Sequence, residues 1–378
     1  MNQRVDEREW IQYQWPYMLK WLGGEQRVND RAYETGAFVR RRKIDSPSDL
    51  LQLLLMWAVA ECPLRVTAAL GAEIGVADVS NVGLLKRFGR AEGWLIALLS
   101  ELLSDGVNDP IERNTRIRLI DATAISRPGS RKTDLRVHMA IHLGTSRTDE
   151  IELTDGRGSE SLNRFTFQAG EIVLADKGYA HRDPLARLAA TGAYFVVPLP
   201  YASLPLETVD GKPFDLFGAL RRLPEAGPQE FAVQFRPSRG VPVACRLVAM
   251  RKSEAAAEAA RARVRANSKR QGAKIDVRTL EFAGFFCILT NALAELSALS
   301  VLDMYRFRWQ IEMKFKSLKS QLHLANVPTQ SLKMLRIYVL AKLLVAVVIE
   351  NLLTGESFFP WGYPIPADQL VASHEVTA

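Results

Sequence analysis

A stretch near the end of the chain combines side chains that bind phosphates with a carboxylate. Residues 302–322 contain no Pro or Gly and many strong helix formers, so they are predicted to form a helix. At ~100° per residue, four side chains project within an arc of roughly 60°: Tyr305, Arg308, Glu312 and Lys319. A carboxylate among cations and a phenol suits a site where a metal ion meets nucleic-acid phosphates. Taken alone, the stretch favours a simpler interpretation, a solvated basic helix with incidental i,i+4 pairs.

Two aspartates follow predicted strands. Asp121 comes after the apolar-rich run at 117–120, and Asp176 comes after the apolar run at 172–175. Carboxylates at strand ends are often exposed where loops form a site, although an Asp also commonly just ends a strand. With Glu312 they make three carboxylates, and ligation by oxygen alone favours Mg²⁺ or Mn²⁺. Two such ions ~3.5–4 Å apart can activate water or a 3′-hydroxyl and stabilise the leaving oxygen during in-line phosphoryl displacement.

Length and charge indicate a globular chain with a polyanionic partner. The 378 residues exceed the usual size of one domain, so two or three units are expected. Hydrophobic and charged fractions of 48% and 24% are ordinary for soluble proteins. The chain carries +7 overall, and residues 251–278 hold nine Lys or Arg against three acidic residues, a net of +6. Such a cluster is typical of a nucleic-acid contact or of a solvated helix face.

Cysteine usage and hydropathy favour a cytoplasmic protein. Cys62, Cys245 and Cys287 are isolated from one another, which gives neither a disulfide framework nor a CxxC metal spacing. The N-terminus lacks the apolar segment of a signal peptide. Residues 334–353 are apolar but interrupted by three charged residues, so a buried core helix is expected there and not a membrane span.

The predicted elements describe a helical beginning, a mixed sheet and an inserted segment. The helices on either side of Gly71 and Gly75 form a candidate helix-turn-helix, with a plain helical bundle as the alternative. Later strands and helices alternate as in a mixed sheet with covering helices. Strands are expected at 116–125, 136–143, 150–153, 171–175, 193–197, 231–235, 244–250 and 284–289, and helices at 49–62, 63–70, 80–88, 91–103, 160–165, 183–190 and 302–322. The predicted divisions are a helical region (1–110), a first core part (111–197), an insertion with a basic helix (198–282), a second core part (283–325) and a C-terminal helical region and tail (326–378).

Three motifs and their order resemble the DDE transposases of bacterial insertion sequences. They are Asp-Ala-Thr at 121–123, Ala-Asp-Lys-Gly-Tyr at 175–179 and Ile-Leu-Thr-Asn at 288–291. The late helix matches the Y-x2-R-x3-E-x6-K pattern that marks insertion-sequence family four, at Tyr305, Arg308, Glu312 and Lys319. The resemblance covers roughly residues 116–324, including a long insertion before the Glu, and covers the N-terminal region only in general character.

The resemblance implies an α/β fold, with an RNase H-like catalytic core interrupted by a mainly β insertion and an all-α DNA-binding region at 1–110. It implies that Asp121, Asp176 and Glu312 are the catalytic residues and the ligands of two Mg²⁺ ions, with Mn²⁺ as a substitute.

The resemblance also implies a set of DNA contacts and a reaction. The implied contacts with the transposon end are Tyr305, Arg308 and Lys319 on phosphates, Lys316 as a helper and Trp309 against the distorted end. Such enzymes bind terminal inverted repeats, cleave both strands at each end, often through a hairpin, and join the 3′-hydroxyls to target DNA. A homodimer acting in trans, in the bacterial cytoplasm at the nucleoid, is implied as well.

One feature departs from relatives that form hairpins. Those relatives place a Trp in or near the insertion to hold a flipped base, whereas residues 195–300 contain no Trp. Phe282, Phe285 and Phe286 are the residues that would take its place.

Two other functions stay open on the sequence. One is an RNase H-like nuclease that cleaves DNA without transposing it, and the other is a catalytically silent DNA-binding regulator derived from a transposase. The three carboxylates argue against the silent regulator. Terminal inverted repeats and short target duplications beside the gene would distinguish a transposase from a nuclease.

Overall fold

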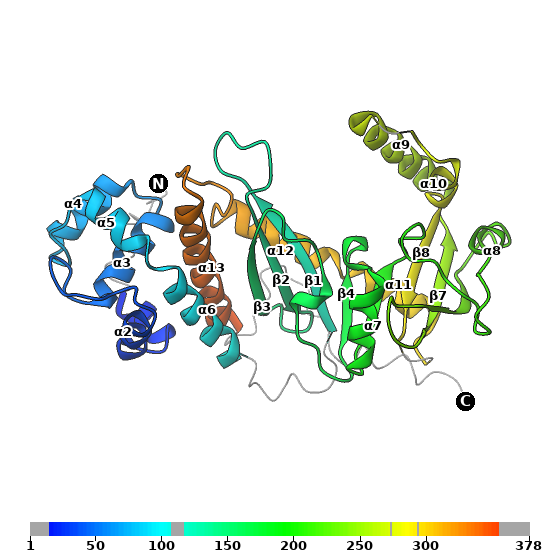
Figure 1. Ribbon diagram of the computed structural model, residues 1–378, viewed down its shortest axis with the longest axis horizontal. Helices are drawn as coiled ribbons and strands as arrows, with labels where there is room; N and C mark the ends of the chain where they lie inside the picture. The colour runs from blue at the N-terminus through cyan, green and yellow to red at the C-terminus, as the bar shows by residue number, and fades with distance from the viewer. Residues whose placement is uncertain (1–14, 107–116, 273, 293–294, 355–378) are drawn as a thin grey trace, which may run out of the picture. The chain divides into compact units, whose positions relative to one another are not determined.

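The computed structural model describes residues 15–106, 117–272, 274–292 and 295–354 (Figure 1). The chain divides into two compact units. Unit 1 comprises Met1–Glu112, Ala122–Gly158 and Met313–Ala378, and unit 2 comprises Arg113–Asp121 and Ser159–Glu312. Strand β1 (Ile117–Ile125) and helix α12 (Trp309–Ser320) each belong partly to both units.

Unit 1 is built mainly from helices. In α3 every residue except Asp49 is buried, because the helix is apolar on nearly all sides and lies in the core. Its start is fixed by a capping box in which the Ser46 hydroxyl accepts from the Asp49 amide at 3.0 Å and Asp49 accepts from the Ser46 amide at 3.0 Å. The elements of this unit are α2 (Glu25–Glu34), α3 (Pro47–Ala58), α4 (Leu64–Glu73), α5 (Asn81–Phe88), α6 (Glu92–Gly106), β2 (Leu135–His142), β3 (Thr148–Asp155) and α13 (Leu332–Thr354).

Helix α13 packs against α6 and α3 and contains a fully buried lysine. Lys342 Nζ donates to Glu61 Oε1 at 2.8 Å and to the carbonyl oxygens of Leu322 and His323 at 2.7 and 3.2 Å. The buried ammonium is thus paired and hydrogen-bonded, as a charge inside a core must be. The prediction of a core helix at 334–353 is confirmed for 334–348, where all residues but Arg336 are buried, whereas Leu352 and Leu353 are exposed. Among the described residues, no helix has the length and apolar character needed to cross a membrane.

Unit 2 is built on a mixed sheet. Strands β1 and β4 pair in parallel through Ile117↔Ile172 to Ile120↔Ala175, and β5 continues the parallel part beside β4. β8, β7 and β6 follow in antiparallel order, and the full strand order is β3-β2-β1-β4-β5-β8-β7-β6. The other elements of this unit are β4 (Ile172–Ala175), β5 (Tyr194–Pro198), β6 (Gln229–Phe235), β7 (Val243–Arg251), β8 (Phe285–Thr290), the 3-10 turns η2 (Leu162–Arg164) and η3 (Lys177–Tyr179), and the helices α7 (Arg182–Ala190), α8 (Leu216–Arg221), α9 (Glu254–Gln271), α10 (Val277–Phe282) and α11 (Ala298–Arg306).

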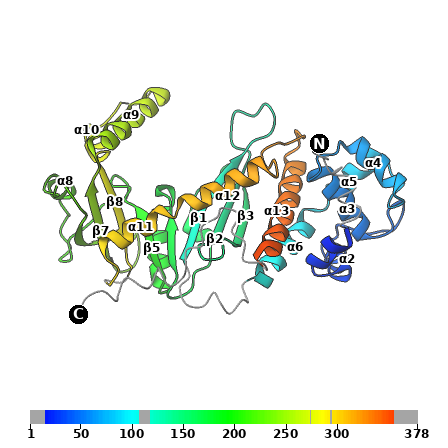
Figure 2. The same ribbon diagram turned by 180° about the vertical axis from the view of Figure 1, so that it is seen from behind.

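Helices cover both faces of the unit 2 sheet. α7 packs on β5 from one face, and α11 packs on β5 and β7 from the other, as the two opposite views show (Figures 1 and 2). The predicted mixed sheet with covering helices is therefore confirmed. The segment predicted as an insertion contributes β6 and β7, and these strands extend the same sheet beyond β8.

Three predicted helices differ from the structure. The stretch at 302–322 is two helices, α11 and α12, because Phe307, Arg308, Gln310 and Ile311 donate to carbonyls three residues back in a tightened turn. Residues 160–165 make only the single turn η2, where Ser161 accepts from the Asn163 amide at 3.2 Å and competes with helix formation. The basic segment at 251–278 is α9 followed by the start of α10, because Gly272 ends α9 in the left-handed conformation at φ 63°.

Candidate functional site

Asp121 and Asp176 lie next to each other on the parallel pair β1–β4. The last register step of that pair joins Ile120 to Ala175, so each aspartate is the next residue on its strand. Asp176 follows the end of β4 directly and precedes the turn η3, without a capping hydrogen bond from its side chain. Asp121 lies in the middle of β1, which corrects the prediction that it stands at or near a strand end. β1 continues because it has β2 as its other neighbour, while its β4 partner ends.

Arg308 links the first of these aspartates to the carboxylate of the late helix. Its Nη2 donates to Glu312 Oε1 at 2.5 Å, and its Nη1 lies 3.9 Å from Asp121 Oδ2. The side chains of Arg308 and Asp121 are 17% and 18% exposed, whereas that of Glu312 is 48% exposed. One half-buried guanidinium therefore joins carboxylates that are far apart in the sequence, and the turn between α11 and α12 positions it.

The Arg308 guanidinium also interacts electrostatically with Asp176 and lies over an aromatic ring. Burial by itself lowers the pKa of Arg308, but Tyr305, Glu312 and Asp176 together raise it above its ordinary value. Its carbon Cζ lies 5.7 Å from the centroid of the Tyr305 ring. Its Nε is buried and makes no hydrogen bond within the described part of the chain, so one donor of this arginine still lacks an acceptor.

Tyr305, which lies beside the Arg308 guanidinium, is itself buried. Its ring packs against that of Phe286 at 6.0 Å between centroids. Burial raises the pKa of the Tyr305 phenol, and the negative charges of Asp176 and Asp121 raise it further, against the effect of Arg308. The phenol is consequently protonated at any physiological pH, and its side chain is only 9% exposed.

The carboxylates match divalent metal ions in donor type. Three carboxylates with no nitrogen or sulfur ligand suit Mg²⁺ or Mn²⁺. In the part of the chain that the structure describes, no three His, Cys, Asp or Glu side chains stand close enough together to hold a metal ion as placed. In this arrangement the guanidinium of Arg308 pairs with both Asp121 and Glu312 and partly offsets their negative charges.

The other residues predicted to bind DNA lie along one side of α12. Trp309, Glu312, Lys316 and Lys319 are exposed at three- and four-residue spacing, while Ile311, Phe315 and Leu318 are buried on the opposite side. Among the described residues, neither lysine has an ion-pair partner. Lys314, two residues before Lys316, is partly buried and pairs with Glu350 at 2.8 Å.

Two carboxylates of unit 2 with close neighbours in the structure were missed by sequence reasoning. Glu171 is buried and lies 3.6 Å from the equally buried guanidinium of Arg118, at the start of the β1–β4 pair. The Glu160 carboxylate lies against Gly178, since a Cβ built on that glycine would stand 1.9 Å from Glu160 Oε2. The apolar residues on either side of Arg118 indicate that it is buried. No spacing in the sequence, however, predicts the pairing of Arg118 with Glu171 or the contact of Glu160 with Gly178.

The three phenylalanines considered as replacements for a Trp all have partners in unit 2. The Phe282 ring lies 4.7 Å from that of Tyr201, and Phe286 packs on Tyr305. Phe285 is buried with the Arg251 guanidinium 5.4 Å from its ring centroid. In this arrangement none of the three offers a wholly open ring.

Comparison with known proteins identifies the family of the chain. Residues 112–348 match the family described as Transposase DDE domain. The chain is 34% identical over 355 residues to the putative transposase InsL for insertion sequence element IS186A of Escherichia coli strain K12, which covers 92% of this chain and 95% of that protein. It is also 34% identical over 356 residues, with the same coverage of both chains, to the transposase for insertion sequence element IS421 of Escherichia coli. The chain therefore belongs to the family of DDE transposases.

Proposed function

We propose that this chain binds the terminal inverted repeats of its insertion sequence, cleaves the DNA at each end and joins the 3′-hydroxyls to target DNA. The observation that carries the proposal is the contact of one guanidinium, that of Arg308, with Glu312 at 2.5 Å and Asp121 at 3.9 Å, beside Asp176, which directly follows the adjoining strand β4. Carboxylates from two parallel strands and a helix, gathered around a cation, suit phosphoryl transfer.

Asp121, Asp176 and Glu312 would hold two divalent ions, Mg²⁺ or Mn²⁺. When bound, such ions lower the pKa of an attacking water or hydroxyl and stabilise the leaving oxygen. Arg308 positions Glu312, and its guanidinium supplies positive charge beside the carboxylates, where a phosphate group would lie. The ring of Tyr305 packs against the Arg308 guanidinium, and its phenol keeps its proton and can donate a hydrogen bond.

We further propose that the exposed side of α12 follows the DNA end. Lys316 and Lys319 carry charges that no carboxylate in the described chain neutralises, so phosphates are suitable partners. Trp309 is 53% exposed and offers an aromatic surface to unstacked bases. The N-terminal helices, with the exposed basic run at 40–43, would recognise the inverted repeat.

Several finer features belong to the same proposal. The match at Tyr305, Arg308, Glu312 and Lys319 supports membership of insertion-sequence family four. A cut-and-paste reaction by a homodimer acting in trans, in the bacterial cytoplasm at the nucleoid, fits that family. So does the division of the chain into a helical region at 1–110, a core split by an insertion at 198–282, and a C-terminal region from 326.

Glu312→Gln tests the proposal. The substitution keeps shape and removes the charge, so Mg²⁺-dependent cleavage of an inverted-repeat duplex should fall by at least about 10³-fold. The exposed i,i+4 pair with Arg308 contributes only about 0.3–0.5 kcal/mol, so the fold and the affinity for end DNA should hardly change. Glu207→Gln, which also removes a carboxylate paired with an arginine at 3.1 Å, is the matched control and should cleave normally. Undiminished cleavage by Glu312→Gln would refute the proposed function.

A further inference from the structure

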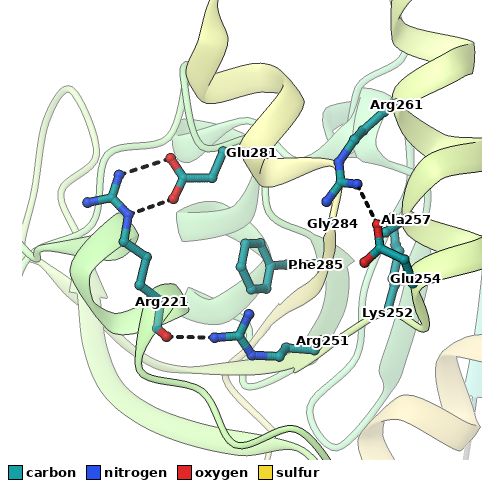
Figure 3. A pocket seen from close by; sticks show the side chains of 9 residues that line it. All are labelled: Arg221, Arg251, Lys252, Glu254, Ala257, Arg261, Glu281, Gly284 and Phe285. Atoms are coloured by element: carbon teal, nitrogen blue, oxygen red, sulfur yellow. Dashed lines mark hydrogen bonds and ion pairs between the residues drawn. The ribbon is translucent and has the colours of Figure 1, made fainter.

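A cavity of about 330 Å³ opens in unit 2 between α8, α9, α10 and the adjoining ends of β7 and β8 (Figure 3). None of the residues assigned above to cleavage lines it. Its lining is mostly charged and includes Arg221, Arg251, Lys252, Arg261, Glu254 and Glu281. Four cations and two carboxylates leave this cavity with a formal excess of two positive charges.

Both carboxylates of the lining are already paired with an arginine. Arg221 holds Glu281 with two hydrogen bonds, of 2.7 and 3.0 Å, and Arg261 Nη1 lies 3.0 Å from Glu254 Oε1 (Figure 3). These pairs balance two of the cations. The remaining excess comes from Arg251 and Lys252.

Arg251 and Lys252 donate only to neutral acceptors in the described part of the chain. Arg251 bonds to the carbonyl oxygens of Arg221 and Leu223 at 2.6 and 3.0 Å, and Lys252 Nζ bonds to the carbonyl oxygen of Ala283 at 2.9 Å. Carbonyl oxygens fix the two side chains in place without cancelling their charge. The cavity thus presents two held cations that have no anion.

Burial makes this excess charge unfavourable until an anion binds. Partial burial lowers the pKa of the Lys252 ammonium; Cys287 acts in the opposite direction, and the nearby Arg263 adds to the lowering. An anion beside the ammonium would offset both effects. A fixed, partly desolvated cation pair is the arrangement that phosphate groups bind.

The aromatic wall of the cavity favours a phosphate over a nucleobase. Phe285 is only 9% exposed, and the Arg251 guanidinium already covers its ring at 5.4 Å from the centroid. A base stacked on this ring would have to displace Arg251 and break its two bonds to carbonyl oxygens. A phosphate needs only the cations.

Helix α9 continues the positive surface away from the cavity. The helix has 18 residues and buries only Ala257, and both opposite views show it as a rod clear of the unit 2 strands (Figures 1 and 2). Arg263, Lys269 and Arg270 on it are exposed, and none forms an ion pair within the described chain. A row of cations leading from a cavity suits a polymer of phosphates better than a single free anion.

We propose that this cavity is a DNA phosphate site, in which Arg251 and Lys252 hold one backbone phosphate while the basic side of α9 contacts adjoining phosphates. The inference rests on the proposed function, because it takes DNA as the ligand. Unit 2 would then have a DNA-binding site that is separate from the three carboxylates and needs no metal ion.

The test is the salt dependence of DNA binding by Lys252→Gln, measured in EDTA by fluorescence anisotropy of a labelled duplex between 50 and 200 mM KCl. Loss of one phosphate contact should flatten the slope of log K against log salt by about 0.9. Lys252→Arg, which keeps the charge, should restore the slope of the unmodified chain. Lys212→Gln is the matched control, since Lys212 is an exposed lysine of unit 2 paired with Asp210 at 2.8 Å, and it should leave the slope unchanged.

The outcomes separate the possible ligands. A Lys252→Gln slope equal to that of the unmodified chain, with equal melting temperatures, would overturn the inference. A second result would also overturn it: inorganic phosphate raises the melting temperature of the unmodified chain but not of Lys252→Gln, while the salt slopes of the two proteins are equal. The site would then bind free phosphate and not DNA. Failure here leaves the cleavage test with Glu312→Gln unaffected, since this binding assay contains no metal ion.

Discussion

Replacing Glu171 by Gln should strongly destabilise unit 2, because it breaks a buried ion pair. The side chains of Arg118 and Glu171 are 4% and 3% exposed and lie 3.6 Å apart. Removing one partner of such a pair typically costs 3–5 kcal/mol, since the remaining charge stays buried without its counter-charge. At ~2–4 °C per kcal/mol for a unit of this size, the melting temperature should fall by roughly 6–20 °C.

The assay is thermal unfolding of the whole chain followed by calorimetry, with Glu207→Gln as the control. Glu207 also pairs with an arginine, Arg236 at 3.1 Å, but that arginine is 55% exposed, so loss of the pair should hardly change the melting temperature. Combining Glu171→Gln with Arg118→Met should recover most of the stability, because no buried charge is then left. A drop for Glu171→Gln as small as that of the control would refute the reasoning.

Two further predictions concern DNA binding and acid stability. Lys269→Glu with Arg270→Glu should weaken DNA binding and flatten its salt dependence, measured by anisotropy, because both side chains are exposed on α9; an unchanged slope would show that their charge is not used. Asp134 has its pKa lowered to about 2, first by the hydrogen bond from Arg127, so its contribution to stability is present above its unfolded pKa of ~4 and is lost as pH falls towards 2. Asp134→Asn should therefore be less stable than the unmodified chain at pH 6 and nearly equal to it at pH 2, as urea unfolding at the two pH values would reveal.

The strands and the placement of two carboxylates were accessible from the sequence. The apolar runs before Asp121 and Asp176 are strands because β-branched side chains packed on two faces leave few alternatives. Their parallel pairing, which the sequence pattern does not specify, then brings the two aspartates side by side. The continuation of β1 past Asp121 depends on its pairing with β2, a long-range contact that local pattern does not contain.

The interruption at Phe307–Arg308 shows where local reasoning ends. Every residue between 302 and 322 is compatible with helix, so propensity predicts one helix there. The tightened turn instead aims Arg308 at Asp121, a partner nearly two hundred residues earlier in the chain. Tertiary contacts outweigh propensity here, and for the same reason the buried pair of Arg118 with Glu171 has no signature in the sequence.

The Lys342 contacts have a consequence for how the chain folds during synthesis. This lysine holds Glu61 and the carbonyl of His323, two residues with left-handed backbones at φ 53° and 47°, and its helix α13 covers α3 and α6. The core of unit 1 therefore combines helices from the first part of the polypeptide with its last described helix, and contacts so distant in sequence form late. A nascent chain must expose the apolar sides of α3 and α6 to solvent until the ribosome has passed residue 354. A message truncated upstream of residue 332 would leave those surfaces permanently uncovered and open to aggregation.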